Sequence, residues 1–197
     1  MERLIAIGLA IYIPIFFVIL LLVVRHFKNY ESGRFSISQL GTKKSRYYRL
    51  FNISTLTMGI LVLMFGYIMP RYFPVSTLAT VLCAKLIFIA GVLAIANSFV
   101  RYDLLPKLHD VIALLSCMTV FALCLVLSTM FSYTSWLSPY LFIFIAGVLF
   151  CSVMMAWYAF GNYKKQKFPK ATWFWEWGIL FSQLSLLFAI SSRLIKL

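Results

Sequence analysis

The sequence predicts an all-α, polytopic integral membrane protein: a six-transmembrane-helix bundle forming a single transmembrane domain over residues 1–197. Three observations predict this fold class. Apolar residues make up 63% of the 197 residues, and charged residues only 12%, whereas a soluble domain carries about 25% charged residues. The mean hydropathy is +0.95. The apolar residues also fall into six blocks, each long enough to cross a hydrocarbon layer of about 30 Å as a helix.

The six predicted helices cover residues about 4–24, 51–69, 76–100, 111–131, 138–160 and 173–192. The first block carries no charge, and no small-residue cleavage site follows it, so we expect a retained helix and not a signal peptide. Prolines lie mainly at block edges, and Pro139 opens the fifth block. Pro14 lies within the first block, where neighbouring helices can satisfy the freed backbone groups.

The basic residues predict the orientation of the chain. With six spans, thirteen basic residues share one side of the membrane: Arg25, Lys28, Arg34, Lys43, Lys44, Arg46, Arg49, Arg101, Lys107, Lys164, Lys165, Lys167 and Lys170. The opposite side has four: Arg3, Arg71, Arg193 and Lys196. By the positive-inside rule we expect a multi-pass protein of the plasma (inner) membrane with both termini extracytoplasmic.

The net charge of +13 is therefore mainly a topology signal and does not indicate a nucleic-acid partner. A second interpretation is that the basic connection between the first two helices attracts anionic lipid, at roughly 1 kcal/mol per basic residue near the surface.

Polar and ionisable side chains gather at one depth, toward the predicted cytoplasmic side. They are Asn52, Asn97, Arg101, His109, Asp110 and Glu176. Ionisable groups within a membrane are costly and indicate a functional site by default. We therefore predict a polar vestibule that binds a ligand, in which Glu176 pairing with Arg101 is one arrangement. The alternative is that these residues cap helix ends and join helices through hydrogen bonds.

Helical spacing assigns faces to these spans. The second predicted helix places Asn52, Thr55, Gly59 and Gly66 on one side, and the sixth has two faces. On the sixth, a small-residue face (Gly178, Ser182, Ser185, Ala189, Ser192) lies opposite Glu176 and Gln183. Small residues let helix backbones approach closely, so we expect these small-residue faces to pack against other helices.

Lys85 is a further binding candidate because it lies about midway through the third predicted helix. A lysine there costs roughly 2.5–3.5 kcal/mol on insertion scales. Two interpretations stay open. If the face containing Ala90 and Ala94 packs inward, Lys85 faces lipid or a partner subunit and extends toward water. If the helix is central, Lys85 faces a cavity and binds an anionic group.

The motifs of known membrane enzymes and cofactor proteins are missing. The four cysteines lie within predicted spans without a C-x-x-C pair, and only two histidines exist, so we expect no metal site and no cofactor. No H-E-x-x-H, G-x-S-x-G or Walker-type loop occurs. His109 and Asp110 diverge by 100° as neighbours on a helix, which disfavours an acid–base dyad. No catalytic residue is assigned, and the sequence leans away from an enzyme.

Three short segments carry a family resemblance: Ser36-Ile37-Ser38-Gln39-Leu40-Gly41, Phe51-Asn52 and Pro106-Lys107-Leu108-His109-Asp110. Their order resembles the bacterial and archaeal six-span domain-of-unknown-function membrane proteins that are distantly similar to the FRAG/DRAM/Sfk family. The resemblance marks Ser38, Leu40, Gly41, Asn52 and His109 as family-like residues. It implies six helices and lipid-related or membrane-homeostasis roles. The chain departs from that pattern at Arg101-Tyr102-Asp103.

Together these observations predict a small non-enzymatic membrane protein that binds or moves a lipid or other amphiphile through a cytoplasmic-side polar vestibule. The alternative is a structural or regulatory subunit of a larger membrane complex, as a homo-oligomer or with another membrane protein. A membrane-embedded enzyme is third. The expected partners are membrane lipids.

Overall fold

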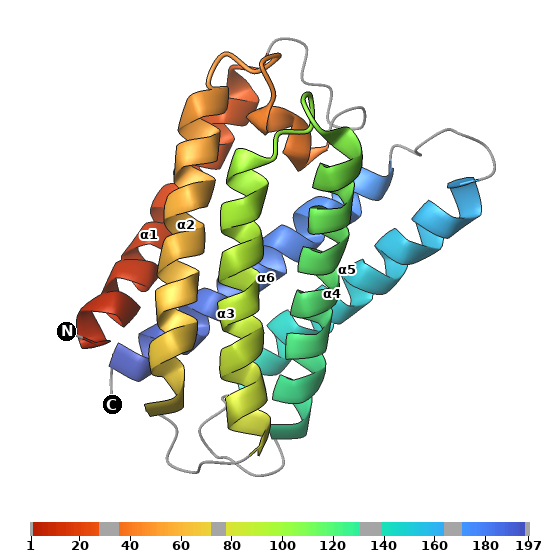
Figure 1. Ribbon diagram of the computed structural model, residues 1–197. Coiled ribbons are helices and arrows are strands. Elements are labelled where there is room, and N and C mark those ends of the chain that lie inside the picture. Colours follow the sequence, from red (N-terminus) through yellow and green to blue (C-terminus); the bar gives the residue numbers. More distant parts are fainter. Residues whose placement is uncertain (1, 28–35, 72–77, 131–138, 164–170, 196–197) are drawn as a thin grey trace.

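The computed structural model describes residues 2–27, 36–71, 78–130, 139–163 and 171–195, and these ranges contain helices and no strand. The elements in chain order are α1 (Glu2–Arg25), η1 (Ile37–Gly41), α2 (Tyr48–Ile68), η2 (Met69–Arg71), α3 (Leu78–Phe99), α4 (Pro106–Met130), α5 (Pro139–Tyr163) and α6 (Ala171–Ile195), where η denotes a 3-10 helix. Figure 1 shows them as one bundle of long helices. The prediction of an all-α, six-helix membrane fold is confirmed. Among the described residues, α1 to α4 each contain a stretch long and apolar enough to cross a membrane.

Two helices begin at a proline. Pro139 opens α5 as predicted, whereas α4 begins at Pro106, several residues before the apolar block that predicted it. Proline suits the first helical position because its fixed φ matches the helix and its missing N–H would be unbonded there. The early start of α4 brings His109 into its first turns, with the His109 N–H donating to the carbonyl of Leu105 over 2.9 Å.

The helices pack mainly against their neighbours in sequence, and α6 closes the bundle by packing on both α5 and α1. The apolar core runs along the bundle and contains buried residues from all six α-helices. A smaller cluster joins Leu20, Val23 and Phe27 near the end of α1 to Leu40 of η1. Figure 1 places both chain termini at the end of the bundle opposite η1.

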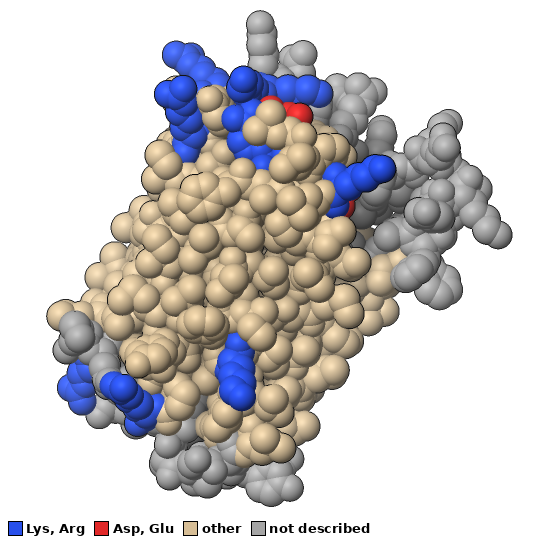
Figure 2. Space-filling view, viewed as in Figure 1, with Lys and Arg blue, Asp and Glu red and all other residues tan. Residues whose placement is uncertain are grey.

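The outer surface of the bundle is apolar. Large side chains such as Ile11, Ile143 and Val153 are more than half exposed. In water, exposed apolar surface costs roughly 25 cal/mol of free energy per Å². Figure 2 shows most basic side chains gathered at the two ends of the molecule, with a broad band of other residues between them that carries one isolated basic side chain on this face. This distribution is that of a membrane-like bundle whose middle faces hydrocarbon.

Glycines of α2 and α3 lie where these two helices approach each other closely. A Cβ added at Gly66 would lie 2.5 Å from the backbone nitrogen of Phe88, and one added at Gly91 would lie 2.4 Å from that of Leu63. The glycines predicted to let the second helix approach a neighbour therefore allow its backbone to touch that of α3.

Candidate functional site

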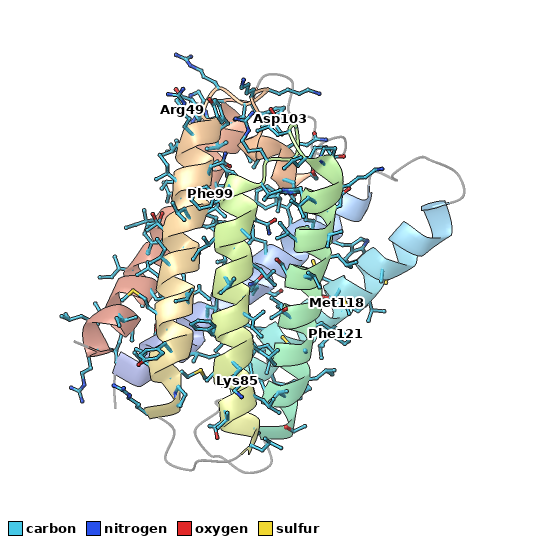
Figure 3. The ribbon with its side chains drawn as sticks, in the orientation of Figure 1. Arg49, Lys85, Phe99, Asp103, Met118 and Phe121 are labelled. Carbon is cyan, nitrogen blue, oxygen red and sulfur yellow. The ribbon has the colours of Figure 1, made fainter. Side chains whose placement is uncertain are left out.

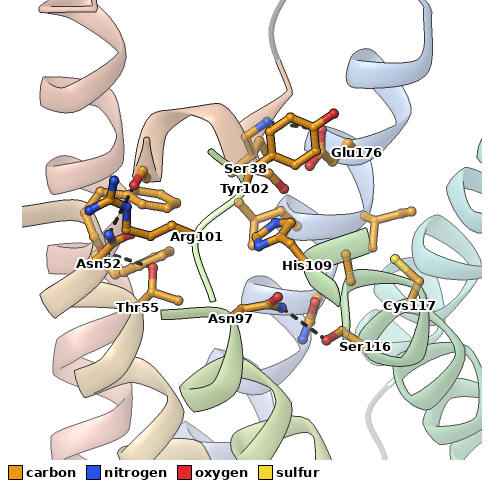
Figure 4. A pocket seen from close by; sticks show the side chains of 18 residues that line it. Ser38, Asn52, Thr55, Asn97, Arg101, Tyr102, His109, Ser116, Cys117 and Glu176 are labelled. Carbon is orange, nitrogen blue, oxygen red and sulfur yellow. Dashed lines mark hydrogen bonds between the residues drawn. The ribbon is translucent and has the colours of Figure 1, made fainter. Parts of the chain in front are cut away.

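A cavity of about 210 Å³ lies at the end of the bundle where α2, α4 and α6 begin and α3 ends. Figure 4 shows how its side chains converge from these helices and from η1. The lining consists of Phe16, Ile37, Ser38, Gly41, Phe51, Asn52, Thr55, Asn97, Arg101, Tyr102, His109, Ala113, Ser116, Cys117, Glu176, Ile179, Leu180 and Gln183.

Helical spacing explains why α6 contributes to this cavity with one face only. Glu176 and Gln183 are seven residues apart and both line the cavity. The opposite face packs on α5: a Cβ added at Gly178 would lie 2.6 Å from Cys151 Sγ, and one at Gly147 would lie 2.6 Å from Ser182 Oγ. The division of this helix into a polar face and a packing face agrees with the pattern in its sequence.

The segment η1 forms one wall of the cavity and is attached at both of its ends. The backbone N–H of Ile37 donates to Glu176 Oε2 over 3.1 Å. At the other end, Asn52 Nδ2 donates to the carbonyl oxygen of Gly41 over 3.2 Å. A Cβ on Gly41 would lie 2.5 Å from Asn52 Oδ1, so glycine lets η1 approach α2. Side chains from α6 and α2 therefore fix the position of this wall.

His109 is 6% exposed, and its ring is held in one orientation. Its Nδ1 lies 2.6 Å from the carbonyl oxygen of Val100. Because a carbonyl only accepts, Nδ1 carries the proton, and in the neutral ring Nε2 is an acceptor. The edge of the ring also contacts Tyr102, with centroids 5.8 Å apart. Nε2 is buried and has no hydrogen-bond partner among the described residues.

Asn97 presents a second unpartnered acceptor. Its Nδ2 donates to Ser116 Oγ over 3.4 Å, and its Oδ1 is buried without a partner among the described residues. Buried polar atoms in folded proteins nearly always have a partner, so each exception needs an explanation. Here two exceptions belong to side chains of the same cavity.

Arg101 lines the cavity but pairs with Asp103, not with Glu176. Its Nη2 lies 2.6 Å from Asp103 Oδ2, and its Nε donates to Oδ1 over 3.0 Å. The guanidinium also lies 5.2 Å from the ring centroid of Tyr48. The arrangement in which Glu176 pairs with Arg101 is therefore not formed, because a carboxylate two residues away reaches the guanidinium with two parallel bonds.

The same ion pair predicts a small acid sensitivity. The hydrogen bond from Arg101 lowers the pKa of Asp103 below its ordinary value, and the Lys43 backbone N–H adds to this. A lowered pKa means that the stabilisation is present above the ordinary pKa of about 4 and is lost as the pH falls through the folded-state value.

We expect Asp103→Asn to weaken the dependence of the free energy of unfolding on pH below about pH 4. The change in this free energy should be less than about 1 kcal/mol, because the ion pair is partly exposed. Unfolding of the detergent-solubilised protein between pH 3 and 7 measures this, with Asp110→Asn as the matched control. Identical pH profiles for Asp103→Asn and wild type would contradict it.

The cavity brings together five of the seven predicted site residues: Asn52, Asn97, Arg101, His109 and Glu176. Asp110 is exposed and outside the lining, because it is rotated by about 100° from His109 on the same helix. Lys85 is also exposed and outside the lining. Figure 3 shows Lys85 near the end of the bundle opposite Arg49 and Asp103. The exposure of Lys85 agrees with the outward-facing interpretation, although the buried face of α3 contains Ala84 and Gly91, while Ala90 and Ala94 are only partly buried.

Sequence reasoning did not nominate several lining residues. Ser116 and Tyr102 carried no signal of their own, although Ser116 is seven residues after His109 and so shares its face. Ser38 and Gly41 entered only through the family resemblance. Of the five family-like residues, Leu40 alone is outside the lining, and it is fully buried in the cluster that attaches η1 to α1.

The site offers hydrogen-bond acceptors, one carboxylate and apolar walls. Within the described ranges, no group of three His, Cys, Asp or Glu side chains is arranged to hold a metal ion. The arrangement is typical of a binding cavity, in which a few polar groups are placed among apolar residues.

Comparison with known proteins gives a family. No curated protein and no solved structure is similar enough to this chain to count as a match. One family model matches residues 10–192, which is most of the chain. It supports the expected domain of unknown function but gives no specific link to the FRAG/DRAM/Sfk proteins. The chain therefore belongs to the family described as protein of unknown function (DUF998).

Proposed function

We propose that this protein binds a lipid or other amphiphile, without catalysing a reaction, through the cavity between η1, α2, α4 and α6. The observation that carries the proposal is that Asn97 Oδ1 and His109 Nε2 are both buried without a partner in a cavity that also has apolar walls. A ligand with a polar group for these atoms and an apolar part for residues such as Phe16 and Leu180 meets both requirements.

The size of the cavity limits which part of a lipid enters. An engineered apolar cavity of roughly 150 Å³ holds benzene, so about 210 Å³ holds a group somewhat larger than one benzene ring. A head group fits this volume, whereas two acyl chains do not. The acyl chains would then lie along the exposed apolar surface of the helices, which is suited to hydrocarbon.

The direction of the cavity follows from the charges, under the same proposal. The exposed residues Lys43, Lys44, Arg46 and Arg49 lie between η1 and the first turn of α2, at the same end of the bundle as the cavity. Figure 2 shows basic side chains gathered at that end. By the positive-inside rule this end is cytoplasmic, so the cavity faces the inner leaflet and both termini are extracytoplasmic. We place the protein in the plasma (inner) membrane on this ground.

Native mass spectrometry of the gently extracted protein, with identification of bound lipid, tests the proposal. Ala113→Phe fills the cavity from α4, and we expect it to reduce bound lipid at least tenfold. Cys117→Phe is a second filling variant from the same helix, so the test does not depend on one substitution folding.

Two controls keep the cavity intact. Met118→Phe makes the same type of change on α4, but Met118 is 60% exposed on the outer surface. Lys85→Leu removes a charge far from the cavity. Both should retain lipid. Lipid retained by both folded filling variants would refute the proposal, and a reproducible protein partner without bound lipid would favour the subunit alternative.

A further inference from the structure

We propose that the cavity recognises a primary ammonium group of a lipid head group, as in a phosphoethanolamine lipid. The inference rests on the proposed lipid-binding function and specifies its ligand. Two observations carry it. The buried lining atoms that have no partner among the described residues are acceptors, and the carboxylate of Glu176 lines the same cavity.

Three acceptors converge on the cavity from three helices: Asn97 Oδ1 from α3, His109 Nε2 from α4 and the Glu176 carboxylate from α6. Figure 4 shows the three side chains along the cavity, with His109 between Asn97 and Glu176. The first two have no described partner, and the carboxylate has further lone pairs beyond those that the backbone N–H groups of Ile37 and Ser38 use. A primary ammonium carries three N–H donors, which matches three acceptors.

Several donors of the lining are already directed to protein acceptors. Ser116 Oγ donates to Ile112 O over 2.8 Å, and Thr55 Oγ1 donates to Phe51 O over 2.9 Å. Asn52 Nδ2 donates to Gly41 O. Arg101 directs its Nε and Nη2 to Asp103. Ser38, Tyr102 and Gln183, which also line the cavity, can each donate and accept. Among the described residues, the buried lining atoms that have no partner are therefore acceptors, which a donor-rich ligand satisfies.

The charge of the lining favours a cation over a neutral hydroxyl group. Glu176 is the only acidic residue in the lining, and the charge of Arg101 is compensated by Asp103. A carboxyl group without a basic partner is thus left at the cavity among apolar residues, where a charge-assisted hydrogen bond to a bound ammonium is strongest. The phosphate of the same head group would lie toward the exposed basic residues Lys43 and Arg46.

The test compares dioleoyl lipids that differ in the head group only, titrated into the full-length protein and followed by native mass spectrometry. Phosphatidylethanolamine and phosphatidylcholine have the same net charge, but the choline group has no N–H donor. We expect phosphatidylethanolamine to bind roughly tenfold more tightly than phosphatidylcholine, the effect of losing charge-assisted hydrogen bonds. Phosphatidylglycerol supplies hydroxyl donors without a cation and should bind no better than phosphatidylcholine.

Glu176→Gln should reduce the preference for phosphatidylethanolamine to about twofold, and Asn97→Leu should reduce it several-fold by removing a different acceptor. Asp110→Asn is the matched control, because it neutralises an exposed acidic residue outside the lining. It should leave the preference unchanged.

The outcomes separate this inference from the proposed function. Equal binding of the three lipids, or a preference for phosphatidylglycerol, overturns the ammonium inference, while lipid loss in Ala113→Phe would still support lipid binding. If no lipid binds, both fail. If free phosphoethanolamine competes at the same concentration as the lipid, the ligand is a soluble amine and the lipid source is refuted.

Discussion

Replacing Gly91 with alanine should lower the thermal stability of the protein by about 1–3 kcal/mol, and replacing it with leucine should prevent folded protein from accumulating. A Cβ at this position would lie 2.4 Å from the backbone nitrogen of Leu63 and 2.6 Å from its Cα. Backbone atoms cannot rotate away as a flexible side chain can, so α2 and α3 must separate. Overpacking of a tight contact costs about 1–3 kcal/mol.

The separation would be costly because packing is the main force available between these helices. Inside a membrane, lipid tails are as apolar as the side chains, and helices associate through close van der Waals contact. Gly59 on α2 faces the same contact, since a Cβ there would lie 3.1 Å from the carbonyl oxygen of Gly91. A shift of α3 would also displace Asn97 and loosen the cavity.

Thermal unfolding in a mild detergent measures the effect, and Gly8→Ala is the matched control. A Cβ at Gly8 would meet its nearest atom at 3.8 Å, which is an ordinary contact. Alanine is also the better helix former, so this control should keep or slightly raise the melting temperature. Equal stability of Gly91→Ala and Gly8→Ala would show that α2 and α3 are not in backbone contact.

The fold was predictable because a membrane imposes simple rules on a sequence. A helix must be about as long as the hydrocarbon layer is thick, so six apolar blocks predict six helices. The small residues of α6 and α2 could likewise be assigned to packing faces, because period and side-chain size alone decide that preference. The start of α4 at Pro106 was missed because hydropathy marks the apolar part of a helix and not its polar first turn.

The candidate site was predictable in part. The position of a residue along its helix predicts its depth in the membrane, but it does not predict which way the side chain points. Depth placed Asn52, His109 and Glu176 at one level, and the cavity joins them. Depth also placed Asp110 there, although rotation about the helix turns it outward. Long-range contacts through a loop carry no periodic signal, so the attachment of η1 to Glu176 could not be read from the sequence.

Glu176→Ala should increase hydrogen exchange at the backbone amide of Ile37 by roughly 10- to 100-fold. This amide donates to Glu176 Oε2 over 3.1 Å, and a hydrogen bond to a charged group contributes about 1.5–3 kcal/mol. The rate of hydrogen exchange reports the free energy of local opening, and it rises tenfold for each 1.4 kcal/mol by which that free energy falls. Hydrogen-exchange mass spectrometry over peptides that contain η1 measures the change.

The effect of this substitution should be confined to the region around Ile37, because a second set of contacts holds η1 against the bundle. Leu40 is fully buried against Leu20 and Val23 of α1, so the melting temperature should change little while exchange at Ile37 rises. Glu176→Gln keeps an acceptor oxygen and should raise exchange less than tenfold. Gln183→Ala, a polar truncation on the same face of α6, should leave it unchanged. Unaltered exchange in Glu176→Ala would mean that the carboxylate does not hold this wall of the cavity.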